Sequence, residues 1–283
     1  MEKRVLGRTN HRSSIATLGG AVFIYPIETH TGDQFIKYAL DRGVNHIDVA
    51  PTYGDAEVRL GKWVREYRED LFVACKTGKR TKEEAAEELR SSLARLQTDH
   101  LDLYQFHGLD TQEDLDTVVG ENGALHAFME AKEEGLIDHI GITSHNPENV
   151  LRALELIDLD TILLPVNYVL GAHPEPRNDF RPVLSVAEER GIGVIAMKAV
   201  AKGPYVGERT RDCWYQPFTE KNKIKEAIRF TLSQPLTTAA TSSDMEIAKM
   251  TIDAAESFEP MDRGEQEALI ARAEDWKPLF PRD

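Results

Sequence analysis

Apolar positions along this chain fall into two alternating patterns. Short β-forming runs occur at residues 44–49, 71–75, 101–106 and 137–143. Between such runs, segments such as residues 56–67 carry apolar side chains three or four positions apart, with charged residues between them. Alternation of this kind is typical of βα units that surround a parallel sheet.

Further runs at residues 15–20, 161–166, 193–197 and 236–240 complete a set of eight strand candidates. Helices are predicted at residues 31–42, 81–96, 124–134, 182–190, 220–233, 243–255 and 263–273, and one more begins at Pro147. Thr31, Thr81 and Ser243 are the predicted N-caps of three of these helices, because each begins a capping-box pattern. The prediction is an α/β fold, a (β/α)8 TIM barrel that occupies residues 1–283 as one domain, with a short hairpin within residues 1–14.

Two stretches have no clear period and are predicted to be loops. Residues 108–123 are acidic, and residues 198–219 are rich in Gly, Pro, Arg and aromatic side chains. A loop of this length in a compact domain usually covers a site.

Composition restricts the class of protein. The hydrophobic content of 41% and charged content of 29% are ordinary for a soluble protein. A net charge of −14 disfavours binding to nucleic acid or to an anionic membrane. The two cysteines, Cys75 and Cys213, have no metal-ligand spacing, so neither a metal site nor a disulfide framework is predicted. The chain has no long apolar run and no signal-peptide core, so the cytoplasm is the expected compartment.

Three successive strand candidates end at residues that can handle protons. Asp48 and Tyr53 follow the second strand, Lys76 the third and His107 the fourth. Each residue alone has a structural explanation, since Asp48 could cap a turn and Tyr53 could pack on a helix. The carboxyl ends of barrel strands meet at one rim, however, so these four side chains, the rim tetrad, are expected to lie together.

The chemistry of the rim tetrad suits the protonation of a developing alkoxide. A free phenol has a pKa of about 10, and a nearby ammonium such as that of Lys76 is expected to lower it. Asp48 would hold the ammonium in place. The imidazole of His107 could orient a carbonyl oxygen beside the phenol.

At these residues the sequence resembles the aldo-keto reductases. The matching segments are GVNHIDVAPTYGDAEVRLG, the lysine within VACKTGKR and the histidine within LYQFHGLD. The resemblance implies that Tyr53 is the proton donor, that Lys76 and Asp48 tune it, and that His107 orients the carbonyl. It further implies a nicotinamide cofactor as hydride source and an N-terminal hairpin that closes the barrel floor. The expected activity is NAD(P)H-dependent reduction of an aldehyde or ketone to an alcohol, or the reverse.

A Rossmann-type cofactor site is not predicted, because the GxGxxG fingerprint is absent from the sequence. Barrels often bind phosphate at the loops after strands seven and eight and at a helix N-terminus there. The resemblance also places Thr143 and Ser144 where the family offers a Ser-Asn pair to the nicotinamide carboxamide, and Asn167 near its usual glutamine. The predicted cofactor contacts are Gly20, Ala21, Asp48, Thr143, Ser144, Asn167, Met197, Lys198, Ser242 and Ser243.

Asp244 departs from the family pattern. Many NADPH-using members have a basic residue near this corner, whereas an aspartate would repel a 2′-phosphate and could accept a hydrogen bond from a ribose hydroxyl. Arg209, Arg211 or Lys249 could compensate if the long loop folds over the site. Family habit favours NADP(H) slightly over NAD(H), and the choice between them stays open.

The predicted substrate contacts are Tyr25, His107, His145 and Trp214. Two of these have alternatives, since His145 could cap the following helix and Trp214 could pack its loop onto the barrel. The expected partner is a small carbonyl compound or alcohol, and the sequence leaves its identity and the oligomeric state open. Two other functions also stay open: a redox-independent lyase or isomerase on the same barrel, and a reductase-like regulatory subunit.

Overall fold

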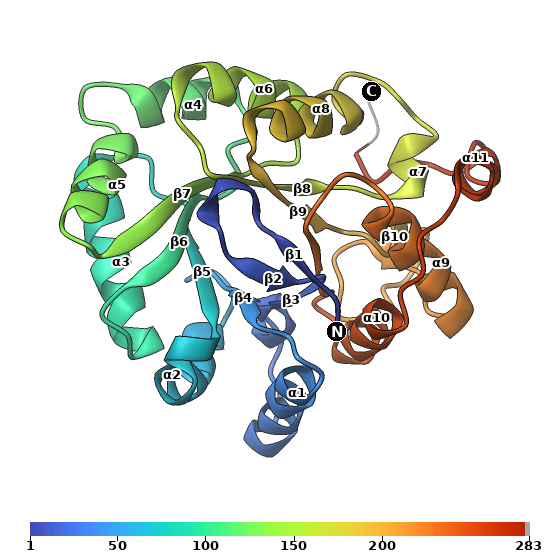
Figure 1. Cartoon of the computed structure of the whole chain (residues 1–283), viewed down its shortest axis with the longest axis horizontal. Helices are drawn as coiled ribbons and strands as arrows, with labels where there is room; N and C mark the ends of the chain where they lie inside the picture. Colours follow the sequence, from blue (N-terminus) through green and yellow to red (C-terminus); the bar gives the residue numbers. More distant parts are fainter. Residues whose placement is uncertain (281–283) are drawn as a thin grey trace.

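A computed structural model describes residues 1–280; the last three residues of the predicted domain lie outside this part (Figure 1). Eight parallel strands close into a barrel in the order β12-β3-β4-β5-β6-β7-β8-β9. The (β/α)8 barrel prediction is therefore confirmed, and each strand candidate contains or overlaps a barrel strand. The strands are β3 (Ala16–Gly19), β4 (His46–Asp48), β5 (Phe72–Thr77), β6 (Leu101–Phe106), β7 (Ile137–Thr143), β8 (Thr161–Pro165), β9 (Gly193–Met197) and β12 (Thr238–Ala240).

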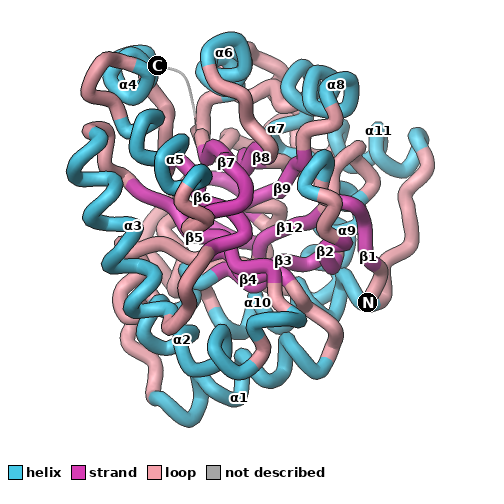
Figure 2. The backbone as a smooth tube through the Cα atoms, turned by 60° about the vertical axis from the view of Figure 1, so that its left-hand side comes forward, coloured by secondary structure: helices cyan, strands magenta, loops and turns pink. Residues whose placement is uncertain are grey.

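Helices form a layer around the barrel (Figure 2). Their apolar stripes face the strands, as where Phe106 of β6 stacks on Phe128 with ring centroids 4.0 Å apart. Among residues 1–280, no helix has both the length and the apolar character needed to cross a membrane. The helices are α1 (Thr29–Asp41), α2 (Ala56–Glu66), α3 (Lys82–Leu96), α4 (Gln112–Val119), α5 (Ala124–Glu133), α6 (Pro147–Leu156), α7 (Tyr168–Gly171), α8 (Arg181–Arg190), α9 (Lys221–Leu232), α10 (Met245–Glu256) and α11 (Arg263–Ala271).

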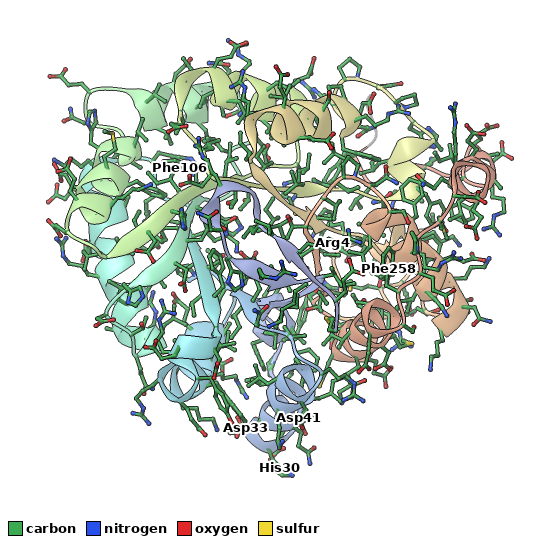
Figure 3. All side chains as sticks on the ribbon, in the orientation of Figure 1. Arg4, His30, Asp33, Asp41, Phe106 and Phe258 are labelled. Carbon is green, nitrogen blue, oxygen red and sulfur yellow. The ribbon has the colours of Figure 1, made fainter. Side chains whose placement is uncertain are left out.

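The predicted N-terminal hairpin is confirmed and lies across one end of the barrel (Figure 1). It consists of β1 (Lys3–Val5) and β2 (Arg12–Ser14), which pair antiparallel. Arg4 fastens it, because its guanidinium donates to the carbonyls of Leu232 and Leu236 at 2.8 and 3.1 Å. The same guanidinium lies 5.1 Å from the ring centroid of Phe258 (Figure 3). The hairpin closes the floor of the barrel and leaves the opposite rim for chemistry.

The two predicted loops contain more structure than their sequences indicate. Residues 108–123 include α4, whose N-cap Thr111 accepts a hydrogen bond from the Asp114 backbone at 3.1 Å. Two buried side chains, Leu115 and Val118, are too few for a periodic signal. Residues 198–219 include β10 (Ala201–Gly203) paired with β11 (Gln216–Pro217).

Two predicted N-caps are wrong. The Glu28 carboxylate caps α1 by accepting from the Thr31 backbone at 3.2 Å, so this helix begins before Thr31. Asp244, rather than Ser243, caps α10 by accepting from the Ile247 backbone at 3.1 Å. In both cases a neighbouring carboxylate takes the cap, since a charged acceptor bonds a helix N-terminus more strongly than a hydroxyl.

Candidate active site

The rim tetrad begins with a buried ion pair between neighbouring strands. Lys76 Nζ lies 2.5 Å from Asp48 Oδ2 and donates to the Val49 carbonyl at 3.0 Å. Both side chains point into the barrel and are buried. Burial opposes the charged form of Lys76, but the charge and hydrogen bond of Asp48, with smaller contributions from Tyr53 and Cys75, together outweigh it, so the pKa of Lys76 lies above its ordinary value. Lys76 therefore stays an ammonium inside the barrel.

Gln105 is a site residue that the sequence reasoning missed. Its amide nitrogen donates to Asp48 Oδ1 at 2.8 Å, and the side chain is buried. The signal was available, because Gln105 stands two positions before His107 and therefore faces the same side of the strand. Gln105 thus holds Oδ1 of Asp48, while Oδ2 of the same carboxylate binds Lys76.

Tyr53 and His107 stand together above this pair. Their rings meet edge to face, with centroids 5.7 Å apart, and Lys76 Nζ is 5.2 Å from the Tyr53 ring centroid. The tight turn after Tyr53 requires Gly54, which has φ +59° and where a Cβ would lie 2.6 Å from the Phe23 carbonyl oxygen. The structure thus brings all four residues of the rim tetrad together.

Burial is the main reason that the Tyr53 phenol and the His107 imidazole are both neutral near pH 7. Burial raises the pKa of the Tyr53 phenol, and the opposing effect of Lys76 does not overcome it. The Lys76 ammonium does act to lower the pKa of Tyr53, as the sequence predicts, but the net pKa lies above the ordinary value for a phenol. Burial and the positive charge of Lys76 lower the pKa of His107 to about 3. The rim therefore offers a phenol and a neutral imidazole, each able to donate a hydrogen bond to one oxygen.

Four of the predicted cofactor contacts lie at the ends of β3 and β7. Gly20 and Ala21 form a 3-10 turn directly after β3, where a Cβ on Gly20 would come within 2.9 Å of the Val49 side chain. The Thr143 hydroxyl accepts from the Gly108 backbone at 2.8 Å, and the Ser144 hydroxyl donates to Asp110 at 2.9 Å. All four residues border the rim, and both hydroxyls already have protein partners.

Asn167, Met197 and Lys198 lie at the ends of β8 and β9. Asn167 is buried, and its carbonyl oxygen caps α7 by accepting from the Leu170 backbone at 2.9 Å. Its amide nitrogen donates to the Lys198 carbonyl at 3.0 Å. Both halves of this amide thus bind backbone, and they hold Lys198 in a left-handed conformation with φ +56°.

A groove at the N-terminus of α10 contains the charged residues that bear on the choice of cofactor. Arg209, Thr210 and Arg211 of the long loop line it together with Asp244 and Glu246. Arg211 lies 2.5 Å from a Glu246 carboxylate oxygen and 3.9 Å from one of Asp244. The long loop therefore folds over this corner and brings Arg211 close to Asp244, as it must if an arginine is to offset the negative charge of Asp244.

Ser242 and Ser243 precede this groove and hold the loop in place. The Ser242 hydroxyl lies 2.9 Å from the Cys213 sulfur, and Ser243 donates to the Asp212 carbonyl at 2.6 Å. Cys213 is buried, so the pair anchors the loop to the end of β12.

The predicted substrate contacts separate into two places. His145 and Trp214 meet edge to face at the rim, with centroids 6.4 Å apart. Tyr25 instead accepts a hydrogen bond from Arg209 and lies 4.8 Å beneath its guanidinium. Tyr25 therefore belongs with the loop that covers the α10 groove, whereas His145 and Trp214 belong with His107.

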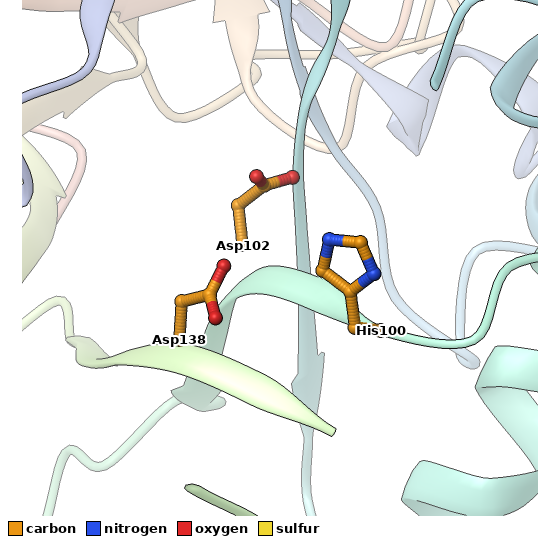
Figure 4. Close-up of side chains that lie close together, drawn as sticks. All are labelled: His100, Asp102 and Asp138. Carbon is orange, nitrogen blue, oxygen red and sulfur yellow. The ribbon is translucent and has the colours of Figure 1, made fainter. Parts of the chain in front are cut away.

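A further group of possible metal ligands lies at the starts of β6 and β7, on the floor side. Ligand atoms of His100, Asp102 and Asp138 lie within 4.8 Å of one another (Figure 4). Asp102 already pairs with Arg68 at 2.9 Å and accepts from the Val73 backbone at 2.7 Å. These protein partners account for its charge, and no metal is assigned there.

Fold and rim together define an α/β-barrel enzyme scaffold with its polar cluster at the carboxyl ends of the strands. The family model for the aldo/keto reductase family matches residues 17–272, and the chain belongs to that family. YqkF, an uncharacterized oxidoreductase of Bacillus subtilis, is 29% identical over 72% of this chain and 66% of its own length. The chain spans about two thirds of the length of this relative.

Solved structures agree on the fold. The holo form of an aldo-keto reductase from Bacillus halodurans superimposes with a TM-score of 0.76 at 24% identity and covers 99% of this chain and 98% of its own. An aldo-keto reductase of Bombyx mori in complex with NADP superimposes with a TM-score of 0.71 at 18% identity, over 100% of both chains.

Proposed function

We propose that this protein is an NAD(P)H-dependent oxidoreductase that reduces an aldehyde or ketone to an alcohol, or catalyses the reverse reaction. The observation that carries the proposal is the packing of Tyr53 and His107 above the buried Asp48–Lys76 pair. Family membership supports the same class of reaction.

The rim tetrad performs the proton half of the reaction. A carbonyl oxygen between Tyr53 and His107 accepts hydrogen bonds from the phenol and from the neutral imidazole, which together polarise the carbonyl. As negative charge grows on that oxygen, Tyr53 gives it the phenolic proton. The phenolate left behind is stabilised by the Lys76 ammonium, which Asp48 and the Val49 carbonyl hold in place. In the alcohol-oxidising direction the same phenolate accepts the proton.

The residues around the rim fit a nicotinamide dinucleotide. When bound, this cofactor supplies or accepts the hydride. We propose that Gly20, Ala21, Asp48, Thr143, Ser144, Asn167, Met197, Lys198, Ser242 and Ser243 border its path from the rim to α10. The α10 groove, lined by two arginines at a helix N-terminus, is suited to phosphate. The carboxylates of Asp212, Asp244 and Glu246 line the same groove, so the slight preference for NADP(H) over NAD(H) follows family habit, with Arg211 near enough to Asp244 to offset part of its charge.

A binding titration and one substitution test this function. NADPH and NADH are titrated separately into the protein and followed by fluorescence, and NADPH is expected to bind more tightly. Tyr53→Phe is expected to lower kcat by about 10²- to 10⁴-fold, the usual contribution of a general acid, with cofactor affinity unchanged. Tyr67→Phe is the matched control, because Tyr67 stacks on Trp63 away from the rim.

Two results would contradict the proposal in different ways. A Tyr53→Phe protein that keeps most of its activity would remove Tyr53 as proton donor. Failure of both nicotinamide cofactors to bind near millimolar concentration would remove the redox class. A redox-independent lyase or isomerase, or a regulatory subunit, would then be the better account of the barrel.

A further inference from the structure

A second polar constellation lies beyond His107, and the proposed proton transfer does not use it. Asp110, just after β6, accepts from the Ser144 hydroxyl at 2.9 Å and from the His145 backbone at 2.6 Å. Its other oxygen lies 2.9 Å from His145 Nδ1. His145 Nε2 in turn lies 2.8 Å from Lys198 Nζ. This Asp110–His145–Lys198 chain connects the ends of β6, β7 and β9.

The protonation states along the chain follow from its hydrogen bonds. Although burial opposes its charge, the bonds from His145 and Ser144 lower the pKa of Asp110 to about 2, so Asp110 is an acceptor. His145 Nδ1 must then carry the hydrogen, which leaves Nε2 as an acceptor for the Lys198 ammonium. Burial and Lys198 lower the pKa of His145, which keeps the ring neutral. The ring therefore orients an ammonium rather than competing with it for charge.

Lys198 is unusual among the cations of the rim. Lys76 and Arg80 each have a carboxylate at 2.5 and 3.2 Å respectively. Within residues 1–280, by contrast, no carboxylate oxygen lies within 4.0 Å of Lys198 Nζ. Its remaining neighbours are the Met197 sulfur at 3.0 Å and the Trp214 ring, 5.2 Å from Nζ to the centroid. Burial lowers the pKa of Lys198 to about 7, although the charge of Asp110, on the far side of His145, acts in the opposite direction.

The backbone at Lys198 is also strained, since a non-glycine residue in the left-handed region is costly. Asn167 maintains this conformation through its bond to the Lys198 carbonyl. A strained backbone and a desolvated cation without a facing carboxylate both cost stability. An anionic ligand at Nζ would offset the second of these costs.

The position of Lys198 relates it to the reacting carbonyl. Burial and the charges of Lys76, His145, Arg80 and Lys198 lower the pKa of His107, so His107 lies within electrostatic reach of both ammonium groups. Beside His145, the rings of Trp214 and Phe280 form an apolar wall, with Phe280 centred 5.1 Å from the imidazole. A molecule with its carbonyl at Tyr53 and His107 would thus extend along this wall toward Lys198.

We propose that Lys198, held by His145 and Asp110, binds a carboxylate of the substrate, so that the preferred substrates are aldehydes or ketones that also carry a carboxylate. His145 and Asp110 are positioning residues in this assignment, and Trp214 contacts the apolar part of the substrate. The inference rests on the proposed carbonyl reduction and names its substrate class.

The cofactor's pyrophosphate is a second source of the same anionic chemistry. The orientation of Lys198 favours the substrate, because Nζ faces His145 and Trp214 while the Lys198 backbone carbonyl faces Asn167. An experiment must therefore measure substrate and cofactor separately.

The test compares two aldehydes of the same framework, 4-carboxybenzaldehyde, which carries a carboxylate, and its methyl ester, which is neutral. For Lys198→Met we expect KM for the carboxylated aldehyde to rise by about 10- to 100-fold, the usual effect of losing a hydrogen bond to a charged group. KM for the ester should rise by a much smaller factor, because the ester has no carboxylate for Nζ to bind. The dissociation constant of NADPH should rise less than KM for the carboxylated aldehyde, because Nζ faces His145 and Trp214 while the Lys198 backbone is the part that borders the proposed cofactor path. Lys198→Arg should recover most of the loss, since it restores the positive charge.

Two further variants separate position from structure. His145→Leu should raise the same KM by a smaller factor, about 3- to 10-fold, because the ammonium remains but loses its orientation. Lys202→Met is the matched control: Lys202 lies on the same loop, where its ammonium is 5.6 Å from the Trp276 ring centroid. It should change neither KM.

The possible failures are distinguishable. If the wild type reduces the ester but shows no preference for the carboxylated aldehyde, this inference falls and the proposed function stands. If Lys198→Met weakens NADPH binding and raises KM for both aldehydes equally, Lys198 serves the cofactor instead and the substrate assignment falls. If the wild type binds NADPH but reduces neither aldehyde, this inference falls and the proposed function stands. If it binds neither NADPH nor NADH and reduces neither aldehyde, the proposed function falls, and this inference with it.

Discussion

The two ends of the barrel interior bury ionisable side chains in opposite ways. At the rim, Lys76 is buried as an ammonium 2.5 Å from Asp48. At the floor, His11 stacks on Phe72 with centroids 4.5 Å apart, and His46 meets the same ring edge-on at 4.9 Å. Asp48 and His46 belong to one strand, β4, and stand two positions apart on its inner face.

What differs between the two ends is the partner. His46 has the Ser13 hydroxyl at 2.9 Å rather than a carboxylate, and burial depresses its pKa well below the usual value. Burial lowers the pKa of His11 to about 4. Of these three side chains, Lys76 has an opposite charge beside it and keeps its own, whereas His46 and His11 have none and stay neutral. The rim can therefore manage proton transfer, whereas the floor is a neutral plug.

The largest effect is expected when the rim is made to resemble the floor. Asp48→Asn leaves the buried Lys76 without its counter-charge and should lower the free energy of unfolding by about 3–5 kcal/mol. Urea denaturation measures this change. The double variant Asp48→Asn with Lys76→Met is the control, and its loss should be smaller than that of Asp48→Asn alone. A loss under about 1 kcal/mol for the single variant would mean that the pair does not hold the charge as described.

An intermediate effect is expected from titrating the floor. Because the folded state keeps His11 and His46 neutral, the unfolded chain binds protons first as the pH falls. The contribution of the two neutral histidines to the free energy of unfolding is complete above a pH of about 6.5, the ordinary pKa of histidine, and declines as the pH falls toward 4. Urea midpoints between pH 7 and 4 should therefore decrease.

Carboxylates titrate in part of that range, so a variant must isolate the histidines. His11→Phe should flatten the decline between pH 6.5 and 5 relative to the wild type, because it removes one of the two groups. An unchanged slope would show that the floor histidines accept protons in the folded state.

The smallest effect is expected from loosening the plug without touching the rim. Arg4→Met removes two hydrogen bonds to the Leu232 and Leu236 carbonyls and should lower the unfolding free energy by about 1–2 kcal/mol. Catalytic constants should stay within about two-fold, because the rim tetrad lies at the other end. Arg12→Met is the control, since within residues 1–280 the Arg12 guanidinium donates one long, exposed hydrogen bond, to the Lys3 carbonyl at 3.4 Å. A fall in kcat of Arg4→Met well beyond about two-fold would contradict the separation of the two ends.

The sequence was sufficient for the barrel and for the assembly of the rim tetrad. Strand β6 was predicted to its exact bounds, and strand ends in a parallel barrel must converge whatever the loops do. The features that the sequence does not predict depend on contacts between residues far apart in the chain. The bond from His145 to Asp110 spans 35 positions and leaves no local pattern. The direction of the Tyr53 pKa shift likewise depends on the depth of burial, which residue types alone do not reveal.

The pairing of β3 with β12 closes the ring with residues from opposite ends of the chain. Ala16 is aligned with Ala239, and the hydroxyls of Thr17 and Thr238 lie 2.9 Å apart. During synthesis, β3 emerges from the ribosome long before its neighbour. At about 5–20 residues per second, roughly 10 to 45 seconds separate the two strands. For that interval β3 has an unpaired edge, so the nascent chain is most exposed to pairing with another molecule before its last strand is made.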